Sequence, residues 1–322
     1  MEQLMNYISS LPGAVAQGMI WGIMAIGVYI TYKVLDIADL TVDGSICTGA
    51  AVCAAMMTMG YSLPVAMLGA FIAGMLAGLL TGLFHTFMGI PAILSGILTQ
   101  LILWSVNLKI MGLAVEKTSA ANLPLSARNY NTLVSMLDMN RSLIVLEVII
   151  VILIALLYWF FGTEYGSSLR STGANLSMSR AQGINTSATK IFGLVLSNGI
   201  VAFSGALLAQ YQGNSDINMG KGAIVIGLAA VIIGEALFGW LSRNNFALKL
   251  LSVILGGIVY FIVYSTVIYL GLDSNYLKML SAIVVAIFLA VPHWRRVYFS
   301  GSGNRKHRRS EKTNSPSKKE EA

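Results

Sequence analysis

The chain has 322 residues, of which 56% are hydrophobic and 11% charged, and its formal net charge is +7. Together with a mean hydropathy of +0.73, this composition excludes an ordinary soluble domain, in which roughly 45–50% of residues are apolar and 25% charged. The apolar runs are long and unbroken, whereas the strands of a membrane barrel show roughly ten-residue alternation. The sequence therefore predicts an all-α polytopic membrane protein.

The first half of the chain alternates irregular stretches with apolar runs of the roughly twenty residues that cross a bilayer as a helix. Residues 1–17 predict an interfacial helix, and no cleaved signal peptide is expected because only Glu2 is charged before Lys33. A stretch with three aspartates, 36–43, then precedes a Gly/Ala-rich helix. The spans expected here are Gly18–Tyr32, the Gly/Ala-rich helix, Pro64–Phe84 and Pro91 to about Met111.

The second half begins after a long polar connection, Gly112–Ser142, and contains a hydrophilic loop, Gly162–Lys190, and a second irregular stretch, YQGNSDINMGKG. The spans expected are Leu143–Phe161, Ile191–Gln210, Ala223–Trp240, Ala247–Leu270 and Leu277–Val291. This gives about nine transmembrane helices in one membrane domain of residues 1–292. Residues 293–322 hold nine Lys and Arg against three Glu, which predicts a basic, disordered cytoplasmic tail near anionic lipid.

The loop Gly162–Lys190 carries the signals of a short helix outside the membrane. Asn175 can cap its first turn, residues 176–182 give about two turns, and Gly183 suits the left-handed position after the last turn. Leucine, methionine and alanine side chains alternate there with arginine and glutamine, a mixture that fits a groove on another protein. A solvated loop with one helical turn is the alternative.

The run LRSTGANLSMSRAQGIN, followed by an apolar segment, resembles the coupling-helix region of ABC importer permeases in the branched-chain amino acid and ribose permease superfamily. In that family the loop docks into a cleft on a cytoplasmic ATPase. A cytoplasmic tail and the alternation of spans put this loop inside the cell as well. The coupling residues that the resemblance implies are Arg170, Gly173, Asn175, Met178, Ala181, Gly183 and Ile184, and the polar face of the short helix adds Arg180.

Two irregular stretches of the chain echo each other. Gly44 and Gly49 match Gly222 and Gly227, and each pair is followed by small apolar residues. In the order of spans the first stretch lies inside and the second outside, as inverted repeats require. The pattern predicts two broken helices around a central pathway. Chance similarity between two glycine-rich membrane segments is the alternative.

The first of these stretches resembles the element GGIDLSVGS of ribose-type permeases at Asp39, Leu40, Val42 and Ser45. It departs from that element at Asp43 and Gly44, so sugar specificity does not follow. The segments IPAILSGILTQLILWSVNLKIMG and DINMGKGAIVIGLAAVIIGEAL resemble permeases of tryptophan and tyrosine uptake. This resemblance, which covers most of the chain before residue 293, implies three partners: an ABC ATPase dimer, a second permease copy and an extracellular solute-binding lipoprotein. It favours an aromatic amino acid as the solute, ahead of branched-chain amino acids, nucleosides and sugars.

Polar residues within the spans or at the broken stretches are the candidates for a translocation pathway, because such groups are costly in a bilayer unless they are partnered. Interhelical hydrogen bonds that only fix packing are the alternative for each. An amino-acid zwitterion needs both a donor for its carboxylate, such as the amide hydrogens of a broken helix, and an acid for its ammonium. An aromatic side chain would pass Trp104 or Tyr211. The candidates are Asp39, Thr41, Asp43, Gly44, Gln100, Trp104, Asn107, Asn198, Gln210, Asp216, Asn218 and Glu235.

The sequence contains no arrangement typical of an enzyme or a metal site. Cys47, Cys53 and the three histidines lack ligand spacing, and no G-x-x-x-x-G-K-[ST] element is present, so ATP and Mg²⁺ are expected to be used by the partner ATPase and no cofactor by this chain. A basic tail alone does not predict a nucleic-acid partner. The leading prediction is a non-enzymatic permease subunit in the cell membrane. An ion-coupled secondary transporter and a non-transporting scaffold are the alternatives.

Overall fold

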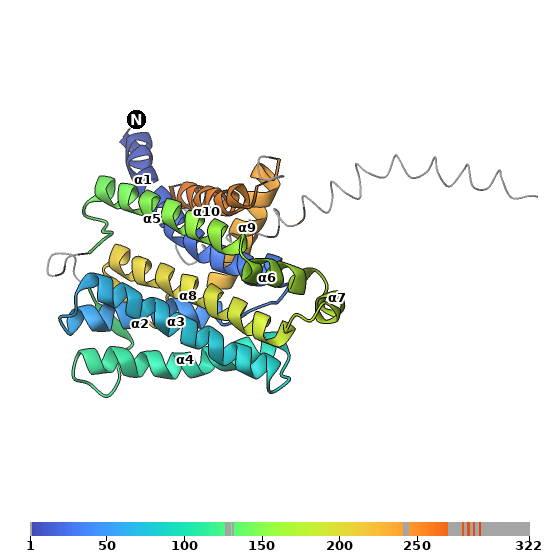
Figure 1. Cartoon of the computed structure of the whole chain (residues 1–322). Coiled ribbons are helices and arrows are strands. Elements are labelled where there is room, and N and C mark those ends of the chain that lie inside the picture. The colour runs from blue at the N-terminus through green and yellow to red at the C-terminus, as the bar shows by residue number, and fades with distance from the viewer. Residues whose placement is uncertain are drawn as a thin grey trace, which may run out of the picture.

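The computed structural model describes residues 2–125, 130, 132–240, 245–269, 279, 282–283, 286 and 290, and most of these residues are helical (Figure 1). Six helices are long and apolar enough to cross a membrane. They are α1 (Glu2–Tyr29, continued by the π-helix η1, Ile30–Val34), α3 (Leu63–Thr86), α4 (Ala92–Ala114), α5 (Met139–Phe161), α8 (Thr186–Gln212) and α10 (Phe246–Tyr269). The shorter apolar helices are α2 (Val42–Thr58) and α9 (Ala223–Phe238). The chain is therefore a multi-pass membrane protein.

Up to residue 269, each predicted span corresponds to a helix of the structure, but two of these helices are shorter than a membrane span. Six of the predicted spans are membrane-length helices, whereas the Gly/Ala-rich helix and the helix after Lys221 are the shorter α2 and α9. The count of about nine spans is thus not established. The last predicted span, Leu277–Val291, is described only at isolated positions, and the basic tail 293–322 lies outside the described residues.

The prediction of an all-α protein misses a small β-ribbon. Strand β1 (Asn122–Pro124) lies in the polar connection before α5, and it pairs antiparallel with β2 (Asn214–Asp216), which follows α8. Leu123 pairs with Ser215, and both residues are buried. Each strand has only three residues, too few for an alternating pattern to be read from the sequence.

Helix α8 is the central packing element: most of its residues are buried, and it packs against α1, α2 and α3. Close contacts with α3 require glycine: a Cβ on Gly74 would meet Asn198 and Ala202, one on Gly78 would meet the Leu194 carbonyl, and one on Gly82 would meet Ile191. These pairs show that α3 and α8 are antiparallel. Gly74, Gly78 and Gly82, spaced four residues apart, thus form one close-packing face on α3.

We expect Gly78→Ala to destabilise the protein by about 1–3 kcal/mol, because the added methyl group would collide with the backbone of α8. The matched control is Gly69→Ala on the same helix, where the new methyl group would collide only with the flexible end of Met56 and would be in ordinary contact with Val52. There the helix propensity of alanine, worth roughly 0.5–1 kcal/mol, offsets the crowding. Thermal denaturation followed by fluorescence-detected size-exclusion chromatography compares the two variants. Equal midpoints would contradict the assigned α3–α8 contact.

The short helices α2 and α9 both begin inside the helical layer and run in opposite directions. Gly44, in the first turn of α2, lies against Gln100 at the middle of α4, and a Cβ on Gly220, just before α9, would meet the Asp43 carbonyl. From this junction α2 runs to the turn at Gly60, and α9 runs toward η1, where Glu235 pairs with Lys33. The two broken stretches of the sequence therefore meet in space.

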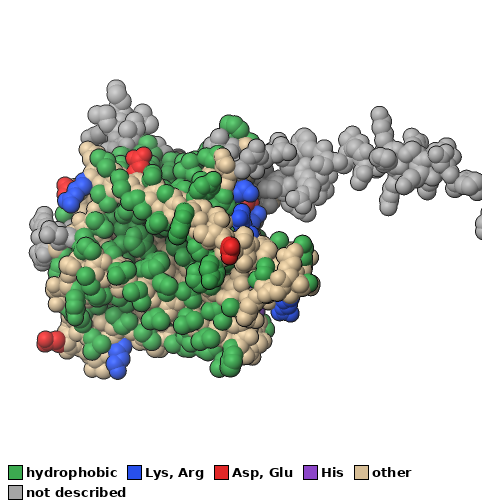
Figure 2. Space-filling view, in the orientation of Figure 1, with side chains coloured by type: hydrophobic (Ala, Val, Ile, Leu, Met, Phe, Trp, Pro, Cys, Tyr) green, Lys and Arg blue, Asp and Glu red, His purple; other side chains and the backbone are tan. Residues whose placement is uncertain are grey.

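The lateral surface of the helices is apolar. Figure 2 shows hydrophobic side chains across the visible face, with the charged side chains mostly near its edges. Exposed members of this surface on α3 and α5 include Leu68, Ile72, Leu76, Val148, Val151, Ile152 and Leu156. Exposed aliphatic side chains at this density fit contact with lipid or with another membrane helix rather than with water.

Candidate functional site

The hydrophilic loop after α5 folds into two short helices that lie together at one end of the long helices (Figure 1). Helix α6 (Glu164–Ala174) was not predicted, and α7 (Leu176–Ala181) is the predicted short helix. The side chain of Asn175 accepts a hydrogen bond of 3.0 Å from the Met178 amide, which confirms it as the N-cap of α7.

The end of α7 is also as the sequence predicts. Gly183 has φ of +83°, and its amide donates to the Arg180 carbonyl at 3.0 Å, while the Ile184 amide donates to the Ser179 carbonyl at 3.1 Å. These two bonds form a Schellman motif, in which glycine takes the left-handed position without a steric penalty. The motif closes the helix and turns the chain toward α8.

The outer surface of α7 presents apolar side chains beside polar ones. Met178 is 59% exposed and Leu176 38% exposed, and Ala181 is also exposed. The Arg180 guanidinium donates from Nε to the Thr186 hydroxyl at 3.0 Å, so it ties α7 to the first turn of α8. An exposed thioether on a helix that is capped at both ends can seat in a groove of another protein without a change in backbone structure.

Two of the predicted coupling residues hold α6 in place. Arg170 donates to the Phe161 carbonyl at 2.9 Å and so joins α6 to the end of α5. Gly173 lies where α6 crosses η1, and a Cβ there would collide with the Val34 carbonyl. Gly173 thus brings α6 into backbone contact with η1, which leads into the irregular segment that precedes α2.

The acid Asp43 joins the two broken helices. Its carboxylate accepts hydrogen bonds from the Gly222 amide at 3.0 Å and from the Ile224 amide at 2.9 Å, so it caps the first turn of α9 from the first turn of α2. Cys47 adds to this junction, because its Sγ accepts from the Gly220 amide at 3.1 Å. Both cysteines of the chain are free and buried. The sequence places Asp43 on a broken helix but gives no sign that it caps the other one.

Asp39 lies in a separate, fully buried network. Its carboxylate accepts from the Asn198 side chain at 2.7 Å and from the Thr41 amide at 2.9 Å, and Ser45 donates to the Asn198 oxygen at 2.6 Å. The hydroxyls of Thr41, Thr81 and Thr99 extend the network to α3 and α4. The structure thus brings together Asp39, Thr41 and Asn198 through hydrogen bonds that join four helices. Interhelical hydrogen bonds of this kind are what the alternative of a purely structural role predicts.

A cavity of about 260 Å³ opens between α2, α4 and the segment that leads into α9, and it gathers five of the predicted pathway residues. They are Asp43, Gly44, Gln100, Trp104 and Asn107. Its other lining residues, which the sequence reasoning missed, are Cys47, Leu101, Ile217 and Lys221. The one available signal for Lys221 was its position beside Gly222, the glycine that echoes Gly44.

The remaining predicted pathway residues lie elsewhere. Gln210 accepts from the Leu133 amide at 2.9 Å and thereby fixes the connection before α5. Asp216 accepts from the Asn218 amide at 2.7 Å in the turn after β2. Glu235 forms an ion pair of 2.8 Å with Lys33, and both side chains are about 40% exposed. Each of these contacts gives its residue a structural partner outside the junction cavity.

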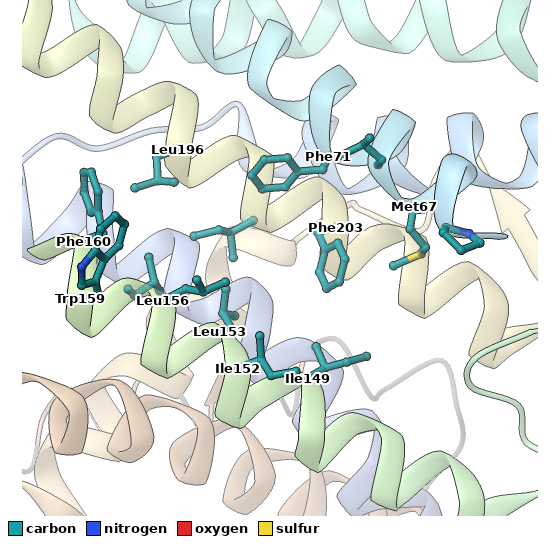
Figure 3. Close-up of a pocket in the computed structure, with 14 residues that line it drawn as sticks. Met67, Phe71, Ile149, Ile152, Leu153, Leu156, Trp159, Phe160, Leu196 and Phe203 are labelled. Carbon is teal, nitrogen blue, oxygen red and sulfur yellow. The ribbon is translucent and has the colours of Figure 1, made fainter. Parts of the chain in front are cut away.

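A larger cavity of about 550 Å³ lies between α3, α5 and α8, but its chemistry differs. Figure 3 shows its lining side chains, which include Phe71, Ile152, Trp159 and Phe203 and are almost entirely hydrocarbon. A polar solute would lose its hydrogen bonds to water there and gain none from the walls. Of these two cavities, the one at the junction is therefore the better site for a polar solute.

Comparison with known proteins gives the family. Residues 11–291 match the family described as branched-chain amino acid transport system, permease component. The tyrosine transport system permease protein of Clostridioides difficile is 39% identical over 284 residues, which cover 88% of this chain and 91% of the relative.

Two further relatives are more distant. An uncharacterized protein of Rickettsia prowazekii is 35% identical over 86% of this chain and 95% of its own length. The autoinducer 2 import system permease protein LsrC of Salmonella typhimurium is 25% identical over 70% of this chain and 63% of its own length. No solved structure gives a significant match. The match over residues 11–291 and the 39% identity to a full-length permease show that this chain belongs to the permease-component family of branched-chain amino acid transport systems.

Proposed function

We propose that this protein is the permease subunit of an ATP-driven ABC importer that moves an amino acid across the cell membrane. The observation that carries the proposal is the junction where α2 and α9 begin inside the membrane layer beside a cavity whose lining includes Asp43, Asn107 and Lys221. Broken helices of this kind form solute sites near the middle of transporters. The opposite directions of α2 and α9 also support the inverted repeat that the glycine echo predicts.

An aromatic amino acid is the favoured solute. The relative from Clostridioides difficile is described as a tyrosine transport permease, and Trp104 offers an aromatic surface on the cavity wall. Branched-chain amino acids are the second candidate, because the family description names them. An extracellular solute-binding lipoprotein would select the solute and deliver it to the permease.

The α6–α7 segment is proposed to receive an ATPase dimer in the cytoplasm. The exposed Met178 and the capped ends of α7 support docking, and the contact of Gly173 with Val34 gives a route to the junction. ATP and Mg²⁺ are used by the ATPase, whose different affinity for two states of the permease drives the change of access. A second, identical permease subunit would complete the pathway, and the basic tail would lie in the cytoplasm.

We expect the tagged protein, purified gently from its native membrane, to bring with it an ATPase and a lipid-anchored binding protein that mass spectrometry identifies. In proteoliposomes containing this complex, uptake of L-[³H]tyrosine should require ATP and persist when ionophores abolish H⁺ and Na⁺ gradients. Uptake that follows the ion gradient and ignores ATP would instead establish a secondary transporter. A complex without any solute flux would establish the scaffold.

A further inference from the structure

Asn107 is a buried polar side chain of the junction cavity that has no hydrogen-bond partner among the described residues. It is 1% exposed, it lines the cavity, and neither its Nδ2 nor its Oδ1 has a hydrogen-bond partner among the described residues. Buried amides are nearly always paired, because an unpaired one keeps the cost of leaving water without compensation. A primary amide offers both donors and an acceptor, so Asn107 is equipped to bind a polar ligand in the cavity.

The backbone amides that were expected to bind the carboxylate of the solute are already occupied. The Gly222 and Ile224 amides at the start of α9 donate to Asp43, and the Thr41 amide before α2 donates to Asp39. Lys221 has no ion pair or hydrogen bond from its ammonium group to a described residue, and it lines the cavity with Asn107. The groups that remain available for an anion therefore include the amide of Asn107 and the ammonium of Lys221.

The cavity also contains the complementary charge. Each carboxylate oxygen of Asp43 accepts one amide hydrogen bond, which leaves a further lone pair on each oxygen for a ligand cation. One cavity thus presents the carboxylate of Asp43, the ammonium of Lys221 and the unpaired amide of Asn107. This set matches the ammonium and carboxylate of an α-amino acid, whereas a sugar needs no charge on either side.

The size and the mouth of the cavity limit the ligand further. Its volume of about 260 Å³ is below the roughly 300–1,000 Å³ of sites that hold drug-sized ligands, so it holds one small molecule. Trp104 is 48% exposed and Leu101 63% exposed, and both lie at its rim. Gln100, Trp104 and Asn107 are spaced i, i+4 and i+7 along α4, which places them on one helix face. A side chain could therefore lie on Trp104 while the charged head reaches Asn107.

We infer that the junction cavity binds the zwitterionic head of the transported amino acid, with Asn107 and Lys221 on its carboxylate, Asp43 on its ammonium, and Trp104 against its side chain. The inference rests on the proposed function for the identity of the solute. It gives the permease a selective site of its own, in addition to any selection by a binding protein.

Equilibrium binding of L-[³H]tyrosine to the full-length protein in lipid nanodiscs tests this site, with unlabelled tyramine, which lacks the carboxylate, as competitor. Wild-type protein should bind tyrosine saturably and at least about tenfold more tightly than tyramine, as expected for loss of a charged hydrogen-bond partner. Lys221→Gln should remove this preference. Lys109→Gln is the matched control, because Lys109 is exposed on α4 and does not line the cavity.

Asn107→Leu separates a ligand-binding role from a structural one. Because the amide has no partner to lose, the variant should keep or raise the denaturation midpoint while binding tyrosine at least about tenfold more weakly. A lowered midpoint with unchanged affinity would overturn the assignment, and so would the absence of saturable wild-type binding up to about 10 mM.

The two proposals fail in different ways. If the wild-type complex takes up tyrosine with ATP and the Asn107→Leu and Lys221→Gln variants do so equally well, the cavity assignment is wrong and the importer function stands. If the permease binds tyrosine with the expected preferences but no ATP-driven uptake occurs, the cavity stands and the coupling to an ATPase is wrong.

Discussion

Asp39→Ala is expected to cause the largest loss of stability of any single change considered for this protein. The variant leaves one hydrogen of the Asn198 side-chain amide and the Thr41 amide without their acceptor inside the packed helices. Each unsatisfied buried group costs about 1–3 kcal/mol, a sum reduced by release of the cost of burying the carboxylate itself. A net loss of about 2–4 kcal/mol should lower the denaturation midpoint and the yield of monodisperse protein in size-exclusion chromatography.

Asp216→Ala is the matched control for this prediction. The Asp216 carboxylate accepts a hydrogen bond of 2.7 Å from the amide two residues ahead, as the Asp39 carboxylate does at 2.9 Å. The turn at Asp216 includes the exposed Asn218, however, and among the described residues no side chain donates to Asp216 as Asn198 does to Asp39. Water can replace the lost bond there, so the midpoint should change little. If Asp39→Ala instead keeps a normal midpoint and loses transport, Asp39 belongs to the translocation pathway.

Gly183→Pro is expected to abolish ATP-driven uptake while the protein still inserts and folds. Proline requires φ near −65°, but residue 183 has φ of +83° and its amide donates to the Arg180 carbonyl. The variant therefore opens the end of α7 and moves the proposed docking surface. Uptake should fall by at least about tenfold, as expected for the loss of a few kcal/mol of coupling, and the ATPase should no longer copurify.

The chain provides a close control at its other end. Gly60 closes α2 with the same motif: its φ is +88°, its amide donates to Met57, and the Tyr61 amide donates to Met56. Because α3 and α8 are antiparallel, this turn lies at the end of the helices away from α7. Gly60→Pro should disturb its own turn and leave ATPase binding intact. Equal loss of ATPase binding in both variants would show a general defect rather than a coupling defect.

Met178→Glu tests the same surface without a change in the backbone. The side chain is 59% exposed, so a charge there costs the isolated permease little, whereas it would be buried against the ATPase. Charge reversal at Arg180 is a less clean test, because Arg180 also holds Thr186. Normal ATPase copurification with Met178→Glu would remove α7 from the interface.

The sequence alone determined the class of the protein and its local elements. The length of the apolar runs locates the membrane-length helices, because a span needs a fixed number of apolar residues wherever it lies in the fold. The limits of α7 follow from Asn175 and Gly183, because caps act within one turn of the chain. The ribbon of β1 and β2 escaped detection, since two three-residue strands depend on each other and not on a local pattern.

Only the tertiary structure decided which polar residues act together. A polar residue in a span signals that a partner exists, but the partner's identity depends on helices far apart in the chain. Asp39 and Asn198 are 159 residues apart in the sequence. Asp43 is separated by a similar number of residues from the α9 amide that it accepts from. Glu235 pairs with Lys33 and not with a residue of the junction. The sequence shows which polar groups would be costly in a bilayer without a partner, whereas the packing of the helices determines which partner each group finds.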